Sequence, residues 1–475
     1  MPSSSKLKRV PGLPLALTAA AVVYAIVLFA HQPLNDSDTL WHIAAGNWIL
    51  AHGAIPRTDP FSYSFAGHPW VAHEWLSELL MAIAYRLGNW GGILILFGAA
   101  ASLALGLLAI HLSRWTDQLT ALVLLLLAAF CIEPMLLARP HMLALPVLEF
   151  WTAHLLIARS QQKAPPYWLL PLMTLWANLH GSFVFGLVFI VPLAWEAVID
   201  AGANRRAAAR DWGLFALGAV AASLATPHFW HGLLFPFQLM SMKQLSNISE
   251  WQPTNFRHLQ PIELALIALL YVIWTRRLRP SLPRIAILLG LLFLTIQHAR
   301  QQMLAGVVGT LVLAEPLGRA LAQQLSATAT RKLTGGRREI LAFLAAVFVL
   351  TGVRLAHPAT RVDEIAGALA HLPPGLSQTP VFNDYGYGGN LIFNGIRPFI
   401  DGRADMYGDS FLATYGAIMS PNETAFTNAA NQYGFRWTIL RPGAPLVGVL
   451  DHLPGWRRLY ADRTAVVHVR VDQTP

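Results

Sequence analysis

The sequence is poor in charged residues and has almost no cysteine. Only 12% of its 475 residues are Asp, Glu, Lys or Arg, about half the share in an ordinary soluble domain. Hydrophobic residues make up 55%, a composition that excludes an ordinary soluble domain and indicates a membrane protein. The single cysteine, Cys131, excludes an internal disulfide framework and, by itself, any cysteine-rich metal site.

Long apolar stretches recur along the chain, and each could cross about 30 Å of hydrocarbon. They are residues 12–30, 90–110, 118–134, 141–157, 166–179, 182–199, 212–226, 261–275, 283–297, 302–322 and 339–355. The first is long for the apolar core of a signal peptide, and no clear small-residue cleavage site follows it, so we expect a retained helix. The sequence therefore predicts an α-helical polytopic membrane protein with about eleven transmembrane helices.

The distribution of Lys and Arg predicts the orientation of these helices, because cytoplasmic loops carry them in excess. With a cytoplasmic N-terminus, the inner segments hold 18 Lys and Arg and the outer loops before residue 354 hold six. The net charge of +9 is then mostly a topology signal. A nucleic-acid partner loses its main support, and membrane lipids are the expected surroundings.

Two regions outside the apolar stretches are large enough to carry function. Within the transmembrane domain, residues 1–355, the long outer loops are 31–89 and 227–260. In the first, Leu40, Ala44 and Trp48 recur at helical spacing, and a second amphipathic stretch ends at Gly88, so we expect two interfacial helices. Residues 356–475 alternate short apolar runs with helical stretches and predict a small C-terminal α/β domain outside the cell membrane.

Two carboxylates stand where the chain leaves the first apolar stretch. Asp36 and Asp38 precede the first interfacial helix, where an Asp commonly caps the free N–H groups of the helix. Alternatively, one is a general base, or both hold a divalent ion such as Mg²⁺ or Mn²⁺ through oxygen ligands. The spacing alone leaves all three interpretations open.

The run DTLWHIAAGNWILAHGAIPRTDPFSYSFAGHPWVAHEWLSELL resembles bacterial GT-C glycosyltransferases of the RgtA/B/C/D-like family. The order of long outer loops, helices and outer C-terminal domain is similar as well, over most of the chain. This resemblance implies that Asp36 or Asp38 is the catalytic base. It also implies a sugar donor linked to a polyprenyl phosphate and a place in the cell envelope, in the bacterial inner membrane.

A second run, VFNDYGYGGNLIFNGIRPFIDGRADMYGDSF, is similar to the Trp-Trp-Asp-Tyr-Gly region of oligosaccharyltransferase catalytic subunits. The resemblance makes Asp384 and Tyr385 candidates for substrate binding. Phe382 and Asn383 replace the two tryptophans, which in those enzymes help recognise a peptide, so a peptide acceptor is not favoured. The alternative is that the glycines supply turns that Asp384 caps. Asp401 and the aspartates after it do not have the spacing of an EF-hand loop.

A lipid phosphate needs cationic partners near the membrane surface, and ionisable groups at that depth are candidates for function. The candidates at outer helix ends and loops are Arg139, His141, His180, His228 and Arg300. The two arginines rank first because a guanidinium can bind two phosphate oxygens. The alternative for each is a contact with lipid headgroups or with a neighbouring acid.

These expectations combine into an inverting glycosyltransferase that moves a sugar to an acceptor outside the cytoplasm, whether a glycan, a lipid or a protein. A different class stays open, a transporter or flippase of lipid-linked sugars. Transporters often contain repeated halves, and we find no convincing repeat in the sequence. A non-catalytic membrane assembly protein is the third possibility, in which both aspartates only cap a helix.

Overall fold

The computed structural model describes residues 10–247, 251–276, 278–324 and 334–471. The chain divides into two compact units. The helical unit comprises Met1–Pro33, Leu87–Pro236 and Ser246–Ala359, and the mixed unit comprises Leu34–Arg86, Phe237–Leu245 and Thr360–Pro475. Most of the first long loop thus belongs to the same compact unit as the C-terminal residues.

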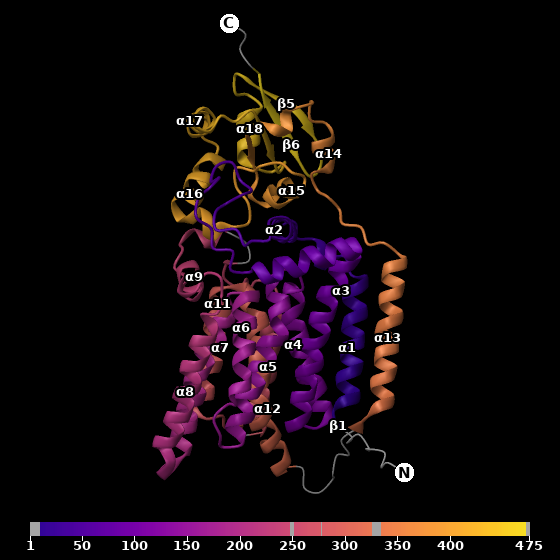
Figure 1. The fold of residues 1–475 in the computed structure, drawn as a ribbon, viewed down its shortest axis with the longest axis vertical. Helices are drawn as coiled ribbons and strands as arrows, with labels where there is room; N and C mark the ends of the chain where they lie inside the picture. The colour runs from indigo at the N-terminus through magenta and orange to yellow at the C-terminus, as the bar shows by residue number, and fades with distance from the viewer. Residues whose placement is uncertain (1–9, 248–250, 277, 325–333, 472–475) are drawn as a thin grey trace. The chain divides into compact units, whose positions relative to one another are not determined.

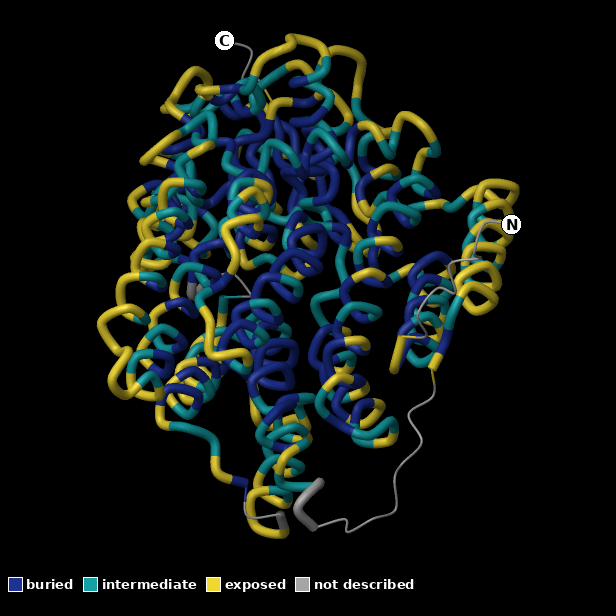
Figure 2. The backbone as a smooth tube through the Cα atoms, turned by 60° about the horizontal axis from the view of Figure 1, so that its bottom comes forward, coloured by how far each residue is buried: buried dark blue, intermediate teal, exposed yellow. Residues whose placement is uncertain are grey.

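The helical unit is a bundle of long helices (Figure 1). Along them, buried and exposed residues alternate with the helical turns, as expected where a helix packs on one side only (Figure 2). Two antiparallel strands of two residues each, β1 (Val10–Pro11) and β2 (Thr334–Gly335), join distant parts of the chain. The helices are α1 (Leu13–Phe29), α3 (Trp75–Trp115, from Leu87 on), α4 (Gln118–Ile132), α5 (Pro140–Ser160), α6 (Leu170–Leu179), α7 (Phe183–Asp200), α8 (Arg205–Ser223), α9 (Trp230–Met240, up to Pro236), α10 (Pro261–Arg276), α11 (Leu282–Gln297), α12 (Gln302–Gln324) and α13 (Arg337–Ala356).

Each of the eleven predicted apolar stretches coincides with one of these helices. By length and composition, six helices in the described residues could cross a membrane, and α1, α10 and α11 are shorter apolar helices. Helix α6 has only 10 residues, about 15 Å at the rise of an α-helix and half of the hydrocarbon thickness. The several apolar helices are therefore present, and the number of eleven membrane crossings stays a prediction.

Helix α3 is interrupted where the sequence predicts the end of an interfacial helix. Gly88 has φ −148° and Asn89 has φ 49°, so neither is helical. Asparagine is one of the few residues that adopt positive φ at low cost. The break separates residues 75–87 from the apolar stretch that follows.

Two buried arginines inside the bundle are paired with buried glutamates. Arg284 donates to Glu196 (3.0 Å) and to Glu315 (2.8 Å), and Arg159 donates to Glu196 (3.2 Å). These pairs link α5, α7, α11 and α12. The sequence analysis counted Arg159 and Arg284 among the inner-loop cations, but both are buried within helices. The excess of inner cations is large without them.

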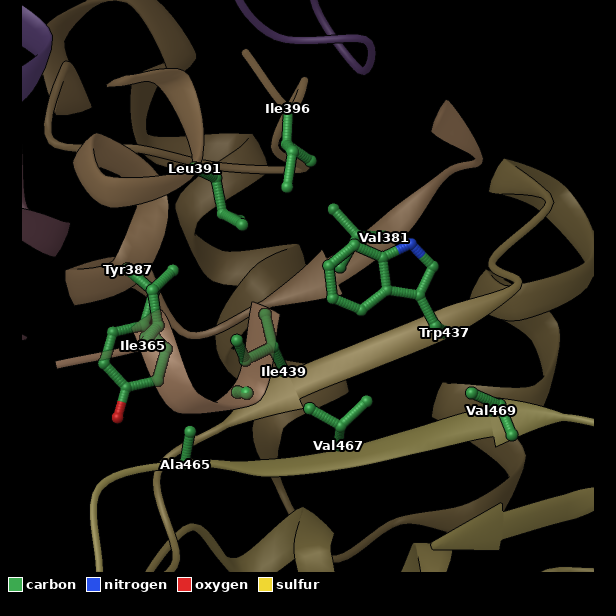
Figure 3. Packing of buried hydrophobic residues seen from close by; sticks show 11 residues of the cluster. Ile365, Val381, Tyr387, Leu391, Ile396, Trp437, Ile439, Ala465, Val467 and Val469 are labelled. Atoms are coloured by element: carbon green, nitrogen blue, oxygen red, sulfur yellow. The ribbon is translucent and has the colours of Figure 1, made fainter. Parts of the chain in front are cut away.

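The mixed unit contains a four-stranded sheet in the order β3-β4-β6-β5. β3 runs parallel to β4, and the other pairs are antiparallel. Apolar side chains of β3, β4 and β6 pack with residues of α14, of α15 and of the segments beside them into one buried cluster (Figure 3). The strands are β3 (Val381–Asn383), β4 (Trp437–Leu440), β5 (Trp456–Ala461) and β6 (Val466–Arg470), and the helices α2 (Asp38–His52), α14 (Ala366–Ala370), α15 (Gly388–Phe393), α16 (Ala404–Met419), α17 (Glu423–Tyr433) and α18 (Pro445–Leu450).

Candidate active site

The acidic pair forms the turn that starts α2. The Asp36 carboxylate accepts a hydrogen bond from the backbone N–H of Asp38 (2.8 Å), and Asp36 is only 7% exposed. Asp38 is half-buried and lies in the first turn of α2, where the helix dipole favours a negative charge. The two carboxylates therefore have different surroundings, although they stand two residues apart.

Two glycines of the C-terminal segment press against this turn. A Cβ atom on Gly389 would lie 2.1 Å from the Ser37 carbonyl oxygen, and one on Gly402 would lie 2.2 Å from Asp38 Oδ1. Only glycine permits an approach this close. The turn-rich run of the second resemblance thus packs directly on the aspartates of the first, and α15 lies along α2 (Figure 1).

A cation approaches the same turn from the chain after α13. Arg361 Nε donates to the Leu34 carbonyl oxygen (3.0 Å). Burial lowers the pKa of Arg361, and the negative charges of Asp363, Glu364 and Asp36 oppose this effect. Asp36 is therefore within electrostatic reach of a guanidinium that the sequence analysis did not select.

The Asp-Gly-Arg sequence at 401–403 forms a buried ion network with the first loop. Arg403 donates to Asp401 through Nε (2.8 Å) and Nη2 (2.7 Å), and to Asp59 through Nη1 (2.7 Å). Burial lowers the pKa of Arg403, but Asp401, Tyr407 and Asp59 together outweigh it, so this pKa is raised well above its usual value. The Tyr407 hydroxyl donates to Asp401 (2.7 Å). This network fixes the loop before α3 on the segment that carries Gly402.

One turn along α2 from Asp38, a histidine meets two acids at the start of α3. His42 Nε2 lies 3.9 Å from Glu74, and His42 Nδ1 lies 3.6 Å from Glu78. His42 and Glu78 are both buried. The sequence analysis missed this cluster, although Asp38 and His42, like Glu74 and Glu78, are four residues apart and so share a helix face.

The second pair of predicted site residues lies at the end of β3. Asp384 accepts from the backbone N–H of Gly386 (2.9 Å) and lies 3.4 Å from Arg441. Burial raises the pKa of Asp384, and the Gly386 N–H and Arg441 lower it in part. The backbone N–H of Tyr385 donates to the Tyr415 hydroxyl (2.8 Å). Asp384 thus caps the glycine turn, as the alternative interpretation expects.

The five predicted phosphate contacts all lie in the helical unit. His141 and His180 come close, with ring centroids 6.2 Å apart. His141 Nε2 lies 2.8 Å from the Met135 carbonyl oxygen, and His180 Nδ1 accepts from the Ser182 N–H (3.1 Å).

The two arginines and the remaining histidine of this set stand at helix ends. Arg139 precedes α5, and the guanidinium of Arg300 lies 4.5 Å from the ring centroid of Trp251. His228 is half-buried just before α9. These residues belong to one compact unit and the acidic pair belongs to the other.

The acidic pair by itself does not make a ligand set for a divalent ion. In the residues that the structure describes, no group of three or more His, Cys, Asp or Glu side chains is arranged to hold a metal. One oxygen of Asp36 already accepts from the Asp38 N–H. We therefore derive no step through Mg²⁺ or Mn²⁺.

No family model and no curated protein sequence matches the chain, but solved structures do. The oligosaccharyltransferase AglB from Archaeoglobus fulgidus, in complex with an inhibitory peptide and a dolichol-phosphate, matches with a TM-score of 0.56 at 12% identity. The match covers 97% of this chain and 74% of that one. A second A. fulgidus oligosaccharyltransferase structure, tethered to an acceptor peptide, gives 0.51 at 12% identity over 90% and 68% of the two chains.

ArnT from Cupriavidus metallidurans in the apo state also matches, with a TM-score of 0.51 at 16% identity. The match covers 96% of this chain and 97% of that one. This is the GT-C fold. The fold predicted from the two resemblances is thereby confirmed, and the three matches cover 97%, 90% and 96% of this chain.

Proposed function

We propose that this protein is a membrane glycosyltransferase with a polyprenyl-phosphate-linked sugar donor, and that Asp38 is its general base. The observation that carries the proposal is the Asp38 carboxylate held at the start of α2, against the backbone of Gly402. Two sequence runs with separate resemblances to GT-C enzymes meet there. The fold it shares with AglB, whose structure contains a dolichol-phosphate, supports a lipid-linked donor.

Asp38 is the better candidate for the base because the Asp36 carboxylate already accepts a hydrogen bond within the turn that starts α2. Asp36 is more buried and accepts from the Asp38 N–H, whereas Asp38 is half-buried. In the reaction, an acceptor hydroxyl attacks the anomeric carbon from the face opposite the lipid phosphate, so the configuration inverts. Asp38 takes the hydroxyl proton, which requires an oxygen-to-oxygen distance of about 2.6–3.2 Å. The bond to the phosphate breaks, and its electron pair leaves with the phosphate.

Arg139 and Arg300 are the proposed contacts of the departing phosphate, with His141, His180 and His228 as further candidates. A guanidinium stabilises negative charge that grows on a leaving phosphate, and a partly dry site strengthens the contact. Asp384 and Tyr385 are proposed to line the acceptor side. The acceptor is outside the cytoplasm and is a glycan, a lipid or a protein.

The test uses the full-length protein in lipid nanodiscs with a panel of undecaprenyl-phosphate sugars. Mass spectrometry follows the release of undecaprenyl phosphate and the glycosylated product. We expect Asp38→Asn to lower the turnover of the active donor at least about 100-fold. Asp36→Asn keeps an oxygen that can accept from the Asp38 N–H, and we expect a loss of less than about tenfold.

Full activity in Asp38→Asn would remove this residue as the base. If both variants lose activity equally, the distinction between the two acids is wrong. Movement of the lipid-linked sugar across the bilayer without a covalent product would instead favour a transporter or flippase.

A further inference from the structure

A buried hydrogen-bond donor lies beside the proposed base. Trp41 is one helical turn from Asp38 and only 7% exposed, and its indole Nε1 has no hydrogen-bond partner in the described part of the chain. A Cβ atom on Gly402 would lie 2.2 Å from Asp38 Oδ1 and 2.8 Å from Trp41 Nε1. The Asp38 carboxylate and the Trp41 indole nitrogen therefore both lie close to the Gly402 backbone.

Packing holds the Trp41 ring in this orientation. The ring belongs to a buried cluster with Trp70 and Ile392, which come from the first loop and from α15. The His42 ring packs against the Trp41 ring, with centroids 3.6 Å apart. A Cβ atom on Gly389 would lie 3.6 Å from Trp41 Cδ1. Because neighbours from several segments enclose the ring, its N–H stays buried next to the point at Gly402 that the Asp38 carboxylate also approaches. A buried N–H normally finds an acceptor.

We propose that Trp41 is a positioning residue for the base, an inference that rests on the proposed function. A carboxylate that takes a proton through one oxygen needs its second oxygen held. The Trp41 N–H donates to that second oxygen when the acceptor hydroxyl binds the first. A donor to the charged form also favours it, so Asp38 stays deprotonated to lower pH.

Other titratable groups surround this pair, and the test has to separate their effects from that of Trp41. α15 carries none. The groups on the other elements packed here are Asp36 before α2, His42 on α2, His73 and Glu74 after Trp70, Arg361 after α13, and Asp401 and Arg403 on either side of Gly402.

The variant Trp41→Phe keeps the aromatic packing and removes only the indole ring edge with its N–H. With the donor that is active in the nanodisc assay, we expect kcat to fall about tenfold while KM for the donor stays unchanged. The acid limb of the kcat profile should move to higher pH, because Asp38 loses a donor that favours its charged form. The surrounding acids and bases are unaltered, so the shift can be assigned to Trp41. The control is Trp48→Phe on the same helix, whose ring stacks on His52 instead, and we expect no change in kcat or in the profile.

A second variant tests the same geometry without touching tryptophan. Gly402→Ala places a methyl group at the point between the carboxylate and the indole, and we expect a loss of kcat at least as large. The matched control is Gly443→Ala, a loop glycine of the same unit with no atom within 4 Å of the added Cβ, which should keep full activity. Circular dichroism and thermal unfolding show whether each variant folds.

The outcomes distinguish failure of the Trp41 inference from failure of the proposed function. If Trp41→Phe folds and retains the kcat and the pH profile of the natural protein, the inference is wrong. A loss of kcat without movement of the acid limb identifies a merely structural tryptophan and also overturns it. Activity in Asp38→Asn, or no turnover of any donor, overturns the proposed function and this inference together. Loss in Asp38→Asn with a normal Trp41→Phe overturns this inference alone.

Discussion

At the scale of single residues, several buried charges of this protein lie in ion pairs and networks. Arg403 neutralises Asp401, two residues away in sequence, and Asp59, 344 residues away. Arg403 also packs on the rings of Phe61 and Trp70. A buried ion of this kind is costly to leave alone, because desolvation is no longer offset by a partner.

We therefore predict that Arg403→Met destabilises the mixed unit by about 3–5 kcal/mol, since two buried carboxylates lose their cation. Denaturant unfolding of the protein in detergent measures the change. The control is Arg397→Met, which alters an exposed arginine of the same unit and should change stability by less than about 0.5 kcal/mol. Equal stability of the two variants would show that the network is not needed.

Asp405 gives the stability a dependence on pH. Burial raises its pKa from 3.8 to about 6, against the attraction of Arg403. Between these two values the folded state holds the proton more tightly than the unfolded chain does, so its stability decreases as pH rises from about 4 to 6. We predict that Asp405→Asn removes this decrease, so that the variant gains stability relative to the natural protein at pH 7 but not at pH 4.

Thermal unfolding at both pH values measures this effect, and Asp409→Asn on the same helix is the control. The backbone N–H groups of Gln244 and Lys243 lower the pKa of Asp409, so this carboxylate stabilises the fold above its usual pKa. Its replacement should therefore lower the stability at pH 7. A gain in both variants at pH 7 would contradict the assignment to Asp405.

At the scale of elements, the packing of α2 on the start of α3 brings Glu74 and Glu78 close to His42. A Cβ on Gly46 would lie 2.0 Å from the Glu78 carbonyl oxygen, so the two helices touch backbone to backbone. Gly46 lies one turn after His42, and its missing side chain allows α2 and α3 to approach this closely.

We predict that Gly46→Ala forces the helices apart and costs about 1–3 kcal/mol, with a matching loss of transferase activity. Gly416→Ala in α16 is the control, because nothing lies within 4 Å of its added Cβ and alanine favours the helix by up to about 1 kcal/mol. Thermal unfolding of the two variants should therefore move in opposite directions. A stable Gly46→Ala protein would mean that the contact adjusts freely.

At the scale of the whole molecule, the orientation in the membrane can be tested by labelling introduced cysteines, because the chain has only one natural cysteine. Cys131 is buried and reacts slowly. We predict that Arg463→Cys, exposed after β5, reacts with a membrane-impermeant maleimide in cells with an intact inner membrane. Arg206→Cys, exposed at the start of α8, should react only after permeabilisation. The reverse pattern would place the mixed unit in the cytoplasm.

Local patterns in the sequence determined the helices and the acidic turn. Apolar length located every helix of the bundle except α9, which lies in the predicted loop 227–260. The helical spacing of Leu40, Ala44 and Trp48 located α2. Gly88 marked the break in α3. Such features could be predicted because a helix depends on residues three or four apart, and a turn depends on its own few residues. Only the two resemblances directed attention to residues 384–402 as part of a site.

The tertiary structure alone decided what surrounds those aspartates. Gly389 and Gly402 touch the start of α2, and Arg403 pairs with Asp59, across more than 300 residues of intervening sequence. No periodicity reports a contact of that range, because the contact depends on how separate elements pack and not on the residues between them. The length of α6 was likewise misjudged, since an apolar run shows hydrophobicity but not where a helix begins. For this reason the sequence supplied candidate residues, and their different packing is the basis on which we propose Asp38 rather than Asp36 as the base.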